Sequence, residues 1–149
     1  MKIEQEIKQK SFKSEYQKLL INLLFTHGWV MSHQKELFEK HDITTAQFNI
    51  LRILRGSHPD PVSVNMLKER MLDKMSDTSR LVERLRIKGF VDRKICKGDR
   101  RRSEVRITDK GIQLLVDMEY VDEKYNEIFS AVSREEAKTL NMLLDKLRG

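Results

Sequence analysis

Residues 74–111 read KMSDTSRLVERLRIKGFVDRKICKGDRRRSEVRITDKG, and this stretch decides the fold. Apolar residues recur in it at helical spacing as far as Gly89, and a glycine is a common residue just past the end of a helix. We therefore predict a helix that begins near Lys74. Two short runs follow that are typical of strands, Phe90–Cys96 and Ser103–Thr108. The six polar residues between these runs are typical of a hairpin tip, so a β-hairpin is expected.

The predicted helix has two different faces when its residues are placed at 100° per residue. One face is apolar and is expected to be buried; it holds Met75, Leu81, Val82 and Leu85. The other face carries hydroxyl groups near the start and arginines further on: Ser76, Ser79, Arg80 and Arg84. Asp77 could accept a hydrogen bond from a cytosine amino group, but stabilisation of the helix N-terminus is the favoured interpretation.

Further helices are predicted before this stretch. Apolar residues at helical spacing from Tyr16 to Phe38 predict one long helix. Thr44 and Gln47 have the spacing of a capping box, so a second helix is expected to begin there and to end at Gly56. Ser63 can cap a short third helix.

Two helices are predicted after the hairpin. Thr108 can cap a helix whose apolar face runs as far as Val132, and Ser133 with Glu136 forms a second capping box. Leucines on the last helix have little else in a thin chain to cover them, which favours a dimer: Leu140, Leu143, Leu144 and Leu147. A short helix, a turn, a second helix and a β-hairpin together indicate a winged helix-turn-helix.

Positive charge is concentrated in one part of the 149-residue chain, which has a net charge of +6. Residues 68–110 hold 15 Lys and Arg against 8 Asp and Glu, whereas the remainder is slightly acidic. A localised basic surface attracts polyanions because their counterions are released on binding. The charge alone is equally consistent with a surface that is solvated and salt-bridged and binds no nucleic acid. The consecutive residues Arg100, Arg101 and Arg102 repel one another at the hairpin tip, so a polyanion there would relieve an electrostatic cost.

The composition excludes several other classes. Gly and Pro are scarce and aromatic residues make up 7%, which argues against an all-β fold. No apolar run is long enough to span a membrane, and a single cysteine, Cys96, excludes an internal disulfide or a Cys-rich zinc site. A cytoplasmic setting is therefore expected. The sequence has no phosphate-binding glycine loop and no nucleophile elbow, so we expect no enzyme activity, no cofactor and no metal site.

Three segments resemble one known family in the right order. Residues 81–93 resemble the recognition helix and first wing strand of MarR-family regulators. Residues 99–111 resemble that family's wing, in which an Asp-x-Arg motif leads to a Thr-x-x-Gly helix start. Residues 45–48, TAQF, match its second helix. The resemblance extends over roughly residues 15 to 147.

The resemblance implies a mainly α (α+β) fold and a single MarR-type domain over residues 1–149. Its winged helix-turn-helix core, with a two-stranded β-wing, is expected at residues 44–108, and its dimerisation helices at 12–41 and 109–149. The family further implies a homodimer that binds double-stranded DNA at a pseudo-palindromic operator, with two recognition helices in successive major grooves. The expected function is a ligand-responsive transcriptional repressor.

Two groups of residues are expected to contact DNA. The helix contributes Ser76, Thr78, Ser79, Arg80 and Arg84, of which Thr78 faces inward and is the weakest candidate. The wing contributes Arg100, Arg101 and Arg102. By position in the family motif, Arg101 is the minor-groove arginine and Asp99 orients it. Arg102 replaces the small residue common there, which suggests an added phosphate contact.

The resemblance also implies a possible effector. Family members often respond to small aromatic or phenolic molecules bound between the DNA-binding and dimer regions. The candidate lining residues are Trp29, His33, Phe48 and Tyr120, although residues of these types are more often core or ordinary surface. A redox role for Cys96 is not supported, since only Lys94 and Lys97 are near in sequence to lower its pKa.

Two alternative functions use the same basic surface. A sequence-indifferent architectural protein would bind DNA through the same arginines but would have no operator. A protein-interaction module would instead use the basic patch to bind an acidic partner.

Overall fold

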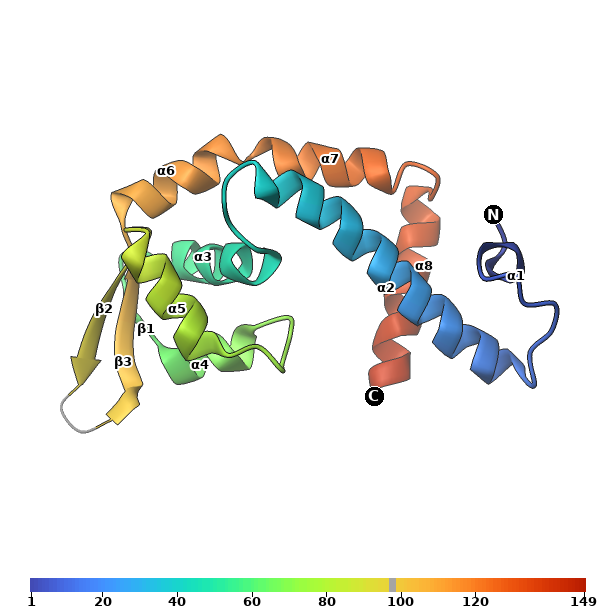
Figure 1. The fold of residues 1–149 in the computed structure, drawn as a ribbon, viewed down its shortest axis with the longest axis horizontal. Helices are drawn as coiled ribbons and strands as arrows, with labels where there is room; N and C mark the ends of the chain where they lie inside the picture. The colour runs from blue at the N-terminus through green and yellow to red at the C-terminus, as the bar shows by residue number, and fades with distance from the viewer. Residues whose placement is uncertain (97–98) are drawn as a thin grey trace.

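The computed structural model describes residues 1–96 and 99–149, except for the side chains of residues 96 and 99–102. Figure 1 shows a winged-helix unit at one end and long helices at the other. In chain order the elements are α1 (Ile3–Glu6), α2 (Glu15–Glu39), α3 (Thr45–Ser57), β1 (Val62–Ser63), α4 (Val64–Arg70), α5 (Thr78–Ile87), β2 (Val91–Cys96), β3 (Asp99–Ile107), α6 (Asp109–Asp117), α7 (Tyr120–Ile128) and α8 (Arg134–Arg148). The expected mainly α fold with a small sheet is confirmed. No helix in the described residues is both long and apolar enough to cross a membrane.

Side-chain caps define most of the helix starts, as the sequence predicted. Thr44 accepts a hydrogen bond from the Gln47 amide at 3.2 Å, and the Gln47 side chain accepts from the Thr44 amide at 2.9 Å. Ser133 forms the corresponding box with Glu136 at the start of α8. Ser63 caps α4 and Thr108 caps α6. Each cap satisfies backbone N–H groups that the first helical turn leaves without a partner.

The hydrophobic core lies where α3, α4 and α5 meet the sheet. Its fully buried side chains include Leu51, Leu67, Leu85 and Val105. The sheet has the order β1-β3-β2 and is antiparallel throughout, with Val62 paired to Val105 and Val91 paired to Ile107. The sequence predicted only two strands. It missed β1 because two residues are too short to show an alternating pattern.

The predicted start of the recognition helix near Lys74 is wrong, since α5 begins at Thr78. Asp73 holds the residues just before α5 in a turn. Its carboxylate accepts hydrogen bonds from the Met75 amide at 2.9 Å and from the Ser76 hydroxyl at 3.0 Å. Short polar side chains compete with helical hydrogen bonds in this way. Met75, which helical spacing assigned to the buried face, is consequently 92% exposed.

The single helix predicted from Thr108 to Val132 is also wrong, because it is divided into α6 and α7. At the break the Glu119 amide bonds to the Val116 carbonyl at 3.1 Å and the Val121 amide to the Met118 carbonyl at 3.0 Å. These three-residue bonds tighten the backbone compared with an α-helix. Met118 and Val121 are both buried at this tightened turn, so the apolar stripe continues across it.

The N-terminus folds back as α1, which the sequence did not predict. Ile3 is buried, and the Lys18 ammonium group lies 2.6 Å from the Glu4 carboxylate. Apolar side chains elsewhere on the long helices remain exposed, among them Leu20, Leu24, Leu140, Met142, Leu143 and Leu147. An apolar surface of this kind typically marks an interaction site.

A close contact joins the winged helix to α6. The Thr108 hydroxyl donates to the Gly89 carbonyl at 2.7 Å and accepts from the Gly111 amide at 3.1 Å. A Cβ atom at Gly111 would lie 2.3 Å from the Phe90 carbonyl oxygen and 2.7 Å from Ile107. Only glycine therefore allows α6 to start this close to the end of β3.

We expect Gly111→Ala to lower the free energy of unfolding by about 2 kcal/mol, because an added methyl group would force the backbone of Phe90 to move. Urea unfolding at a fixed protein concentration measures this change. Gly56→Ala is the matched control, since a Cβ there meets nothing within 4 Å. It should be neutral or slightly stabilising. A Gly111→Ala protein that unfolds at the same urea concentration as the parent would contradict the contact.

Candidate nucleic-acid interface

The orientation of α5 is set by its buried face. Val82 and Leu85 are fully buried and Thr78 is 3% exposed, so the opposite side of the helix points away from the core. Arg80 and Arg84 are exposed, and Ser79 is partly exposed. Asp77 caps α5 by accepting from the Arg80 amide at 3.1 Å, which confirms the structural role favoured for it.

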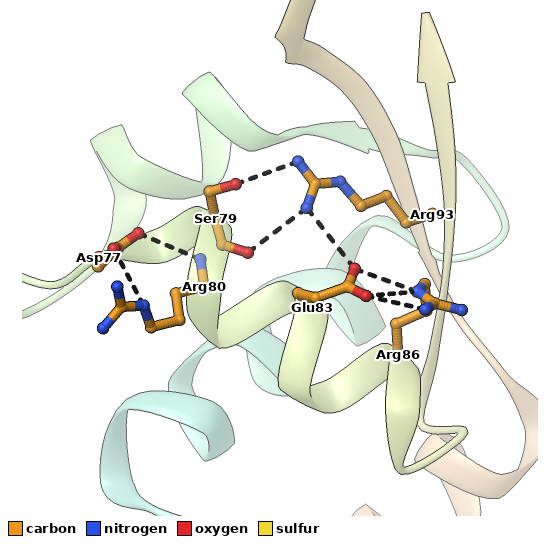
Figure 2. Close-up of polar contacts among 6 residues, drawn as sticks. All are labelled: Asp77, Ser79, Arg80, Glu83, Arg86 and Arg93. Carbon is orange, nitrogen blue, oxygen red and sulfur yellow. Dashed lines mark hydrogen bonds and ion pairs between the residues drawn. The ribbon is translucent and has the colours of Figure 1, made fainter.

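A buried arginine ties the wing to this helix. Arg93 of β2 has a side chain only 6% exposed, and it donates to the Ser79 hydroxyl at 3.1 Å and the Ser79 carbonyl at 3.5 Å. Its guanidinium also lies 3.9 Å from the Glu83 carboxylate. Figure 2 shows Arg93 reaching from its strand to both residues of the helix. The position of β2 relative to α5 is therefore fixed by charged hydrogen bonds as well as by packing.

Glu83 is the acidic residue on the outward side of α5, and its charge is balanced. Arg86 donates to both carboxylate oxygens of Glu83 at distances of 2.8 to 3.2 Å. These hydrogen bonds raise the pKa of Arg86. Figure 2 places Glu83 between Arg86 and Arg93. A carboxylate with two guanidinium groups beside it repels an approaching polyanion much less than an isolated one.

The helix residues predicted to contact DNA do not all reach the surface. Ser79, Arg80 and Arg84 do, and Ser76 is partly exposed while donating to Asp73. The prediction that Thr78 contacts DNA is wrong, because its side chain is buried. Its hydroxyl oxygen has no hydrogen-bond partner among the described atoms. Its side chain belongs to the core because it shares the face of Val82 and Leu85.

The wing candidates lie at the end of the hairpin. Asp99, Arg100, Arg101 and Arg102 belong to the β3 backbone, but their side chains lie outside the described residues. The adjoining part of the hairpin is described. There a cleft of about 540 Å³ separates α5 from β2, and it is lined by Asp77, Ser79, Arg80, Glu83, Arg93 and Ile95.

A second cleft lies on the other side of α5. It has a volume of about 410 Å³ and is bordered by Arg84 and by the corner between α2 and α3. Lys88, just past the end of α5, contacts Asp42 of this corner, with its ammonium group 3.0 Å from the carboxylate. Asp42 has a φ of 53°, which is the left-handed region. The C-cap of α5 is thus in direct contact with the loop that follows α2.

Sequence reasoning missed Arg93 as a positioning residue. The only available signal was its register, since Val91 and Arg93 alternate onto the same face of β2 and Val91 is buried. A charged residue on an inward strand position indicates a buried partner. The identity of the partners, Ser79 and Glu83, depends on tertiary packing that the sequence does not display.

The structure brings two of the four candidates for an effector site together, whereas the other two pack against different aromatic rings. Trp29 and His33 pack edge to face, with ring centroids 4.7 Å apart. Phe48 stacks on Phe38, and the Tyr120 hydroxyl lies 3.1 Å from His41 Nε2. A cavity of about 550 Å³ at the junction of α2 and α3 is lined by none of these four residues; its lining includes Met31, Lys35, Phe38, Ile43 and Ala46.

The pair α4 and α5 followed by the hairpin defines a winged helix-turn-helix protein, the class that places its second helix in the major groove. Residues 41–102 match the MarR family. This match confirms the resemblance of the winged-helix part of the chain to MarR-family regulators. A curated relative is the HTH-type transcriptional repressor IacR of Pseudomonas putida, which is 26% identical over 120 residues, 80% of this chain and 71% of that protein.

Solved structures share the fold over most of this chain. A MarR transcription factor from Planctomyces limnophilus is 28% identical with a TM-score of 0.67, covering 93% of this chain and 98% of that one. The organohalide-sensing regulator RdhR-CbdbA1625, in its 2,4-dichlorophenol-bound form, has a TM-score of 0.80 at 17% identity over 94% of this chain and 85% of that one. Staphylococcus aureus MepR in complex with DNA has a TM-score of 0.71 at 22% identity, and the match covers 85% of this chain and 91% of that one.

We expect Arg93→Met to destabilise the protein by about 2 kcal/mol, because the hydrogen bonds to Ser79 and the ion pair with Glu83 are lost while the side-chain volume is kept. Thermal unfolding measures the change, and hydrogen exchange of the α5 amides should accelerate. Arg86→Met is the matched control: it removes the exposed partner of the same carboxylate and should cost less than about 1 kcal/mol. If Arg93→Met and Arg86→Met lowered the stability of the protein equally, the buried arginine would have no special role.

Proposed function

We propose that this chain is a sequence-specific DNA-binding transcriptional regulator that acts as a ligand-responsive repressor. The observation that carries the proposal is the outward face of α5, where Ser79 and Arg80 stand beside the wing strand while Thr78, Val82 and Leu85 are buried. Arginine can bond two acceptors of guanine or one phosphate, and hydroxyl groups allow the helix to approach closely. The basic surplus of residues 68–110 lies on these same elements.

The proposed docking uses two elements. The ten residues of α5 span about 15 Å and enter the major groove. The wing reaches the adjacent minor groove, where a narrow groove attracts inserted arginines. Arg101 is proposed as the inserted residue and Asp99 as the residue that orients it, with Arg100 and Arg102 on neighbouring phosphates.

We further propose a homodimer. Residues 12–41 and 109–149 would form its interface, with residues 44–108 as the DNA-binding core. The exposed leucines of α2 and α8 support this arrangement, since a second copy would cover them. A twofold dimer implies half-sites about 34–36 Å apart and therefore a pseudo-palindromic operator.

The effector is proposed to be a small aromatic or phenolic molecule. The cavity at the junction of α2 and α3 supports this, because its size suits a small ligand and its lining includes Met31, Phe38 and Ile43. It lies between the proposed dimer helix and the DNA-binding core. A ligand that binds one arrangement of these parts better than the other would change the spacing of the two recognition helices.

Specific recognition is tested by titrating the protein with its own promoter region and with scrambled DNA at one salt concentration. A specificity ratio near one would leave only the architectural alternative. The logarithm of affinity should fall with the logarithm of salt with a slope of roughly −5 or steeper, as several phosphate contacts require. A protein-interaction module would lack this dependence.

Arg84→Ala and Arg101→Ala should each weaken binding to the selected DNA by about 1–3 kcal/mol, since each removes a guanidinium contact to a base or phosphate. Fluorescence anisotropy measures the affinity and analytical ultracentrifugation the dimer, which should stay intact. Lys138→Ala, on the exposed polar side of α8, is the control and should bind as the parent does. Unchanged affinity for Arg101→Ala would remove the wing from the mechanism.

Leu143→Glu combined with Leu147→Glu should convert the dimer into monomers, because two carboxylates would then be buried in an apolar interface. Sedimentation gives the mass, and DNA affinity should fall at the same protein concentration. Lys138→Glu on the exposed polar side of α8 should change neither property. A double variant that sediments as a dimer would place the interface elsewhere.

A further inference from the structure

The loop between α4 and α5 presents an apolar side chain to solvent on a fixed backbone. Met75 is 92% exposed and Leu72 is 83% exposed. The loop itself is well bonded: the Asn49 side chain accepts from the Leu72 amide at 3.0 Å, and Asp73 accepts from the Met75 amide at 2.9 Å. The Lys74 ammonium group also bonds the Glu69 carbonyl. The exposure of Met75 is therefore a property of an ordered turn.

The position of this side chain relates it to the proposed DNA-binding face. Met75 is followed by Ser76 and then by Asp77, the N-cap of α5. In Figure 1 the loop and the start of α5 lie toward the lower side of the winged-helix unit, and β2 runs toward the same side. A helix-turn-helix brings the N-terminal residues of its recognition helix against the edges of the bases. A side chain two residues ahead of the cap is within reach of the same groove.

The chemistry of methionine limits what it can recognise there. Its thioether is a weak acceptor that offers no hydrogen to donate, so it gains little from phosphates or from polar base edges. The major groove contains one apolar group, the C5-methyl of thymine, and apolar side chains are the residues that contact it. Methionine is also flexible enough to fit a methyl group closely.

We propose that Met75 is a specificity-determining residue that contacts the C5-methyl group of a thymine in each half-site. This inference rests on the proposed function, because it requires α5 to lie in the major groove. It adds to that proposal a base identity and a residue that reads it. Leu72 lies further from α5 and serves as a matched apolar residue of the same loop.

The first experiment selects bound sequences from a random double-stranded library with the parent protein, Met75→Gln and Leu72→Gln. Glutamine keeps the approximate length of methionine but replaces the apolar thioether with an amide. We expect the parent and Leu72→Gln to enrich the same sequence with a thymine near each recognition helix. Met75→Gln should lose the preference at that position alone. If the parent enriches no sequence, the proposed function fails; if it enriches a sequence that Met75→Gln reproduces, only this inference fails.

The second experiment removes the methyl group from the DNA. Deoxyuridine replaces the selected thymine, and each protein's affinity for the two DNAs is compared. The parent should lose about fourfold per half-site, the factor expected for burying a methyl-sized group. Met75→Gln should bind both DNAs equally, whereas Met75→Leu should keep part of the discrimination. The ratio of a protein's affinities for the two DNAs does not depend on its overall affinity or stability. A variant that binds DNA more weakly can therefore still be compared with the parent.

Three outcomes would overturn the inference. The parent could fail to distinguish thymine from deoxyuridine, or Met75→Gln could keep the full ratio. Alternatively, Met75→Gln could change the sedimentation of the free protein while leaving base preference unaltered, in which case Met75 contacts a second copy of the chain.

Discussion

A guanidinium removed from water must have its charge balanced, and the candidate DNA-binding face depends on how this is done for Arg93. With 6% of its side chain exposed, Arg93 would be costly in this position without Ser79 and Glu83. These two partners lie on α5, whereas Arg93 lies on β2. Satisfying one buried charge therefore fixes the angle between helix and hairpin, and places Ser79 and Arg80 beside the wing. The orientation of the outward face of α5 therefore depends on the buried contacts of Arg93 with Ser79 and Glu83.

Local sequence signals predicted those parts of the fold that are themselves local. Thr44, Ser63, Thr108 and Ser133 cap helices because each needs only its own neighbours along the chain to do so. The same locality explains the errors. Asp73 bonds residues 75 and 76 and so delays α5, although the apolar spacing continues back through the turn. The α6–α7 break lies within a continuous apolar stripe, and β1 pairs with a segment far away along the chain, so periodicity reports neither feature.

The candidate site divides in a similar way. Helical spacing correctly predicted exposed side chains at Arg80 and Arg84 and placed Val82 and Leu85 in the core. Thr78 was included among the contacts despite its inward direction, and the structure buries it. Arg93 was missed because its role arises from a tertiary contact. The DNA contacts themselves, including those of Arg101, stay predictions.

The Thr108 hydroxyl is hydrogen-bonded to both Gly89 and Gly111, so it ties the end of α5 and the sheet to the start of α6. A movement between these elements would break both hydrogen bonds and open the close contact between Gly111 and Phe90. The chain itself connects the block that these elements form to the long helices at two places: the corner between α2 and α3 and the tightened turn at Met118. Because Thr108 ties the end of α5, the sheet and the start of α6 together, a displacement of this block would carry the helix and the wing along as one body.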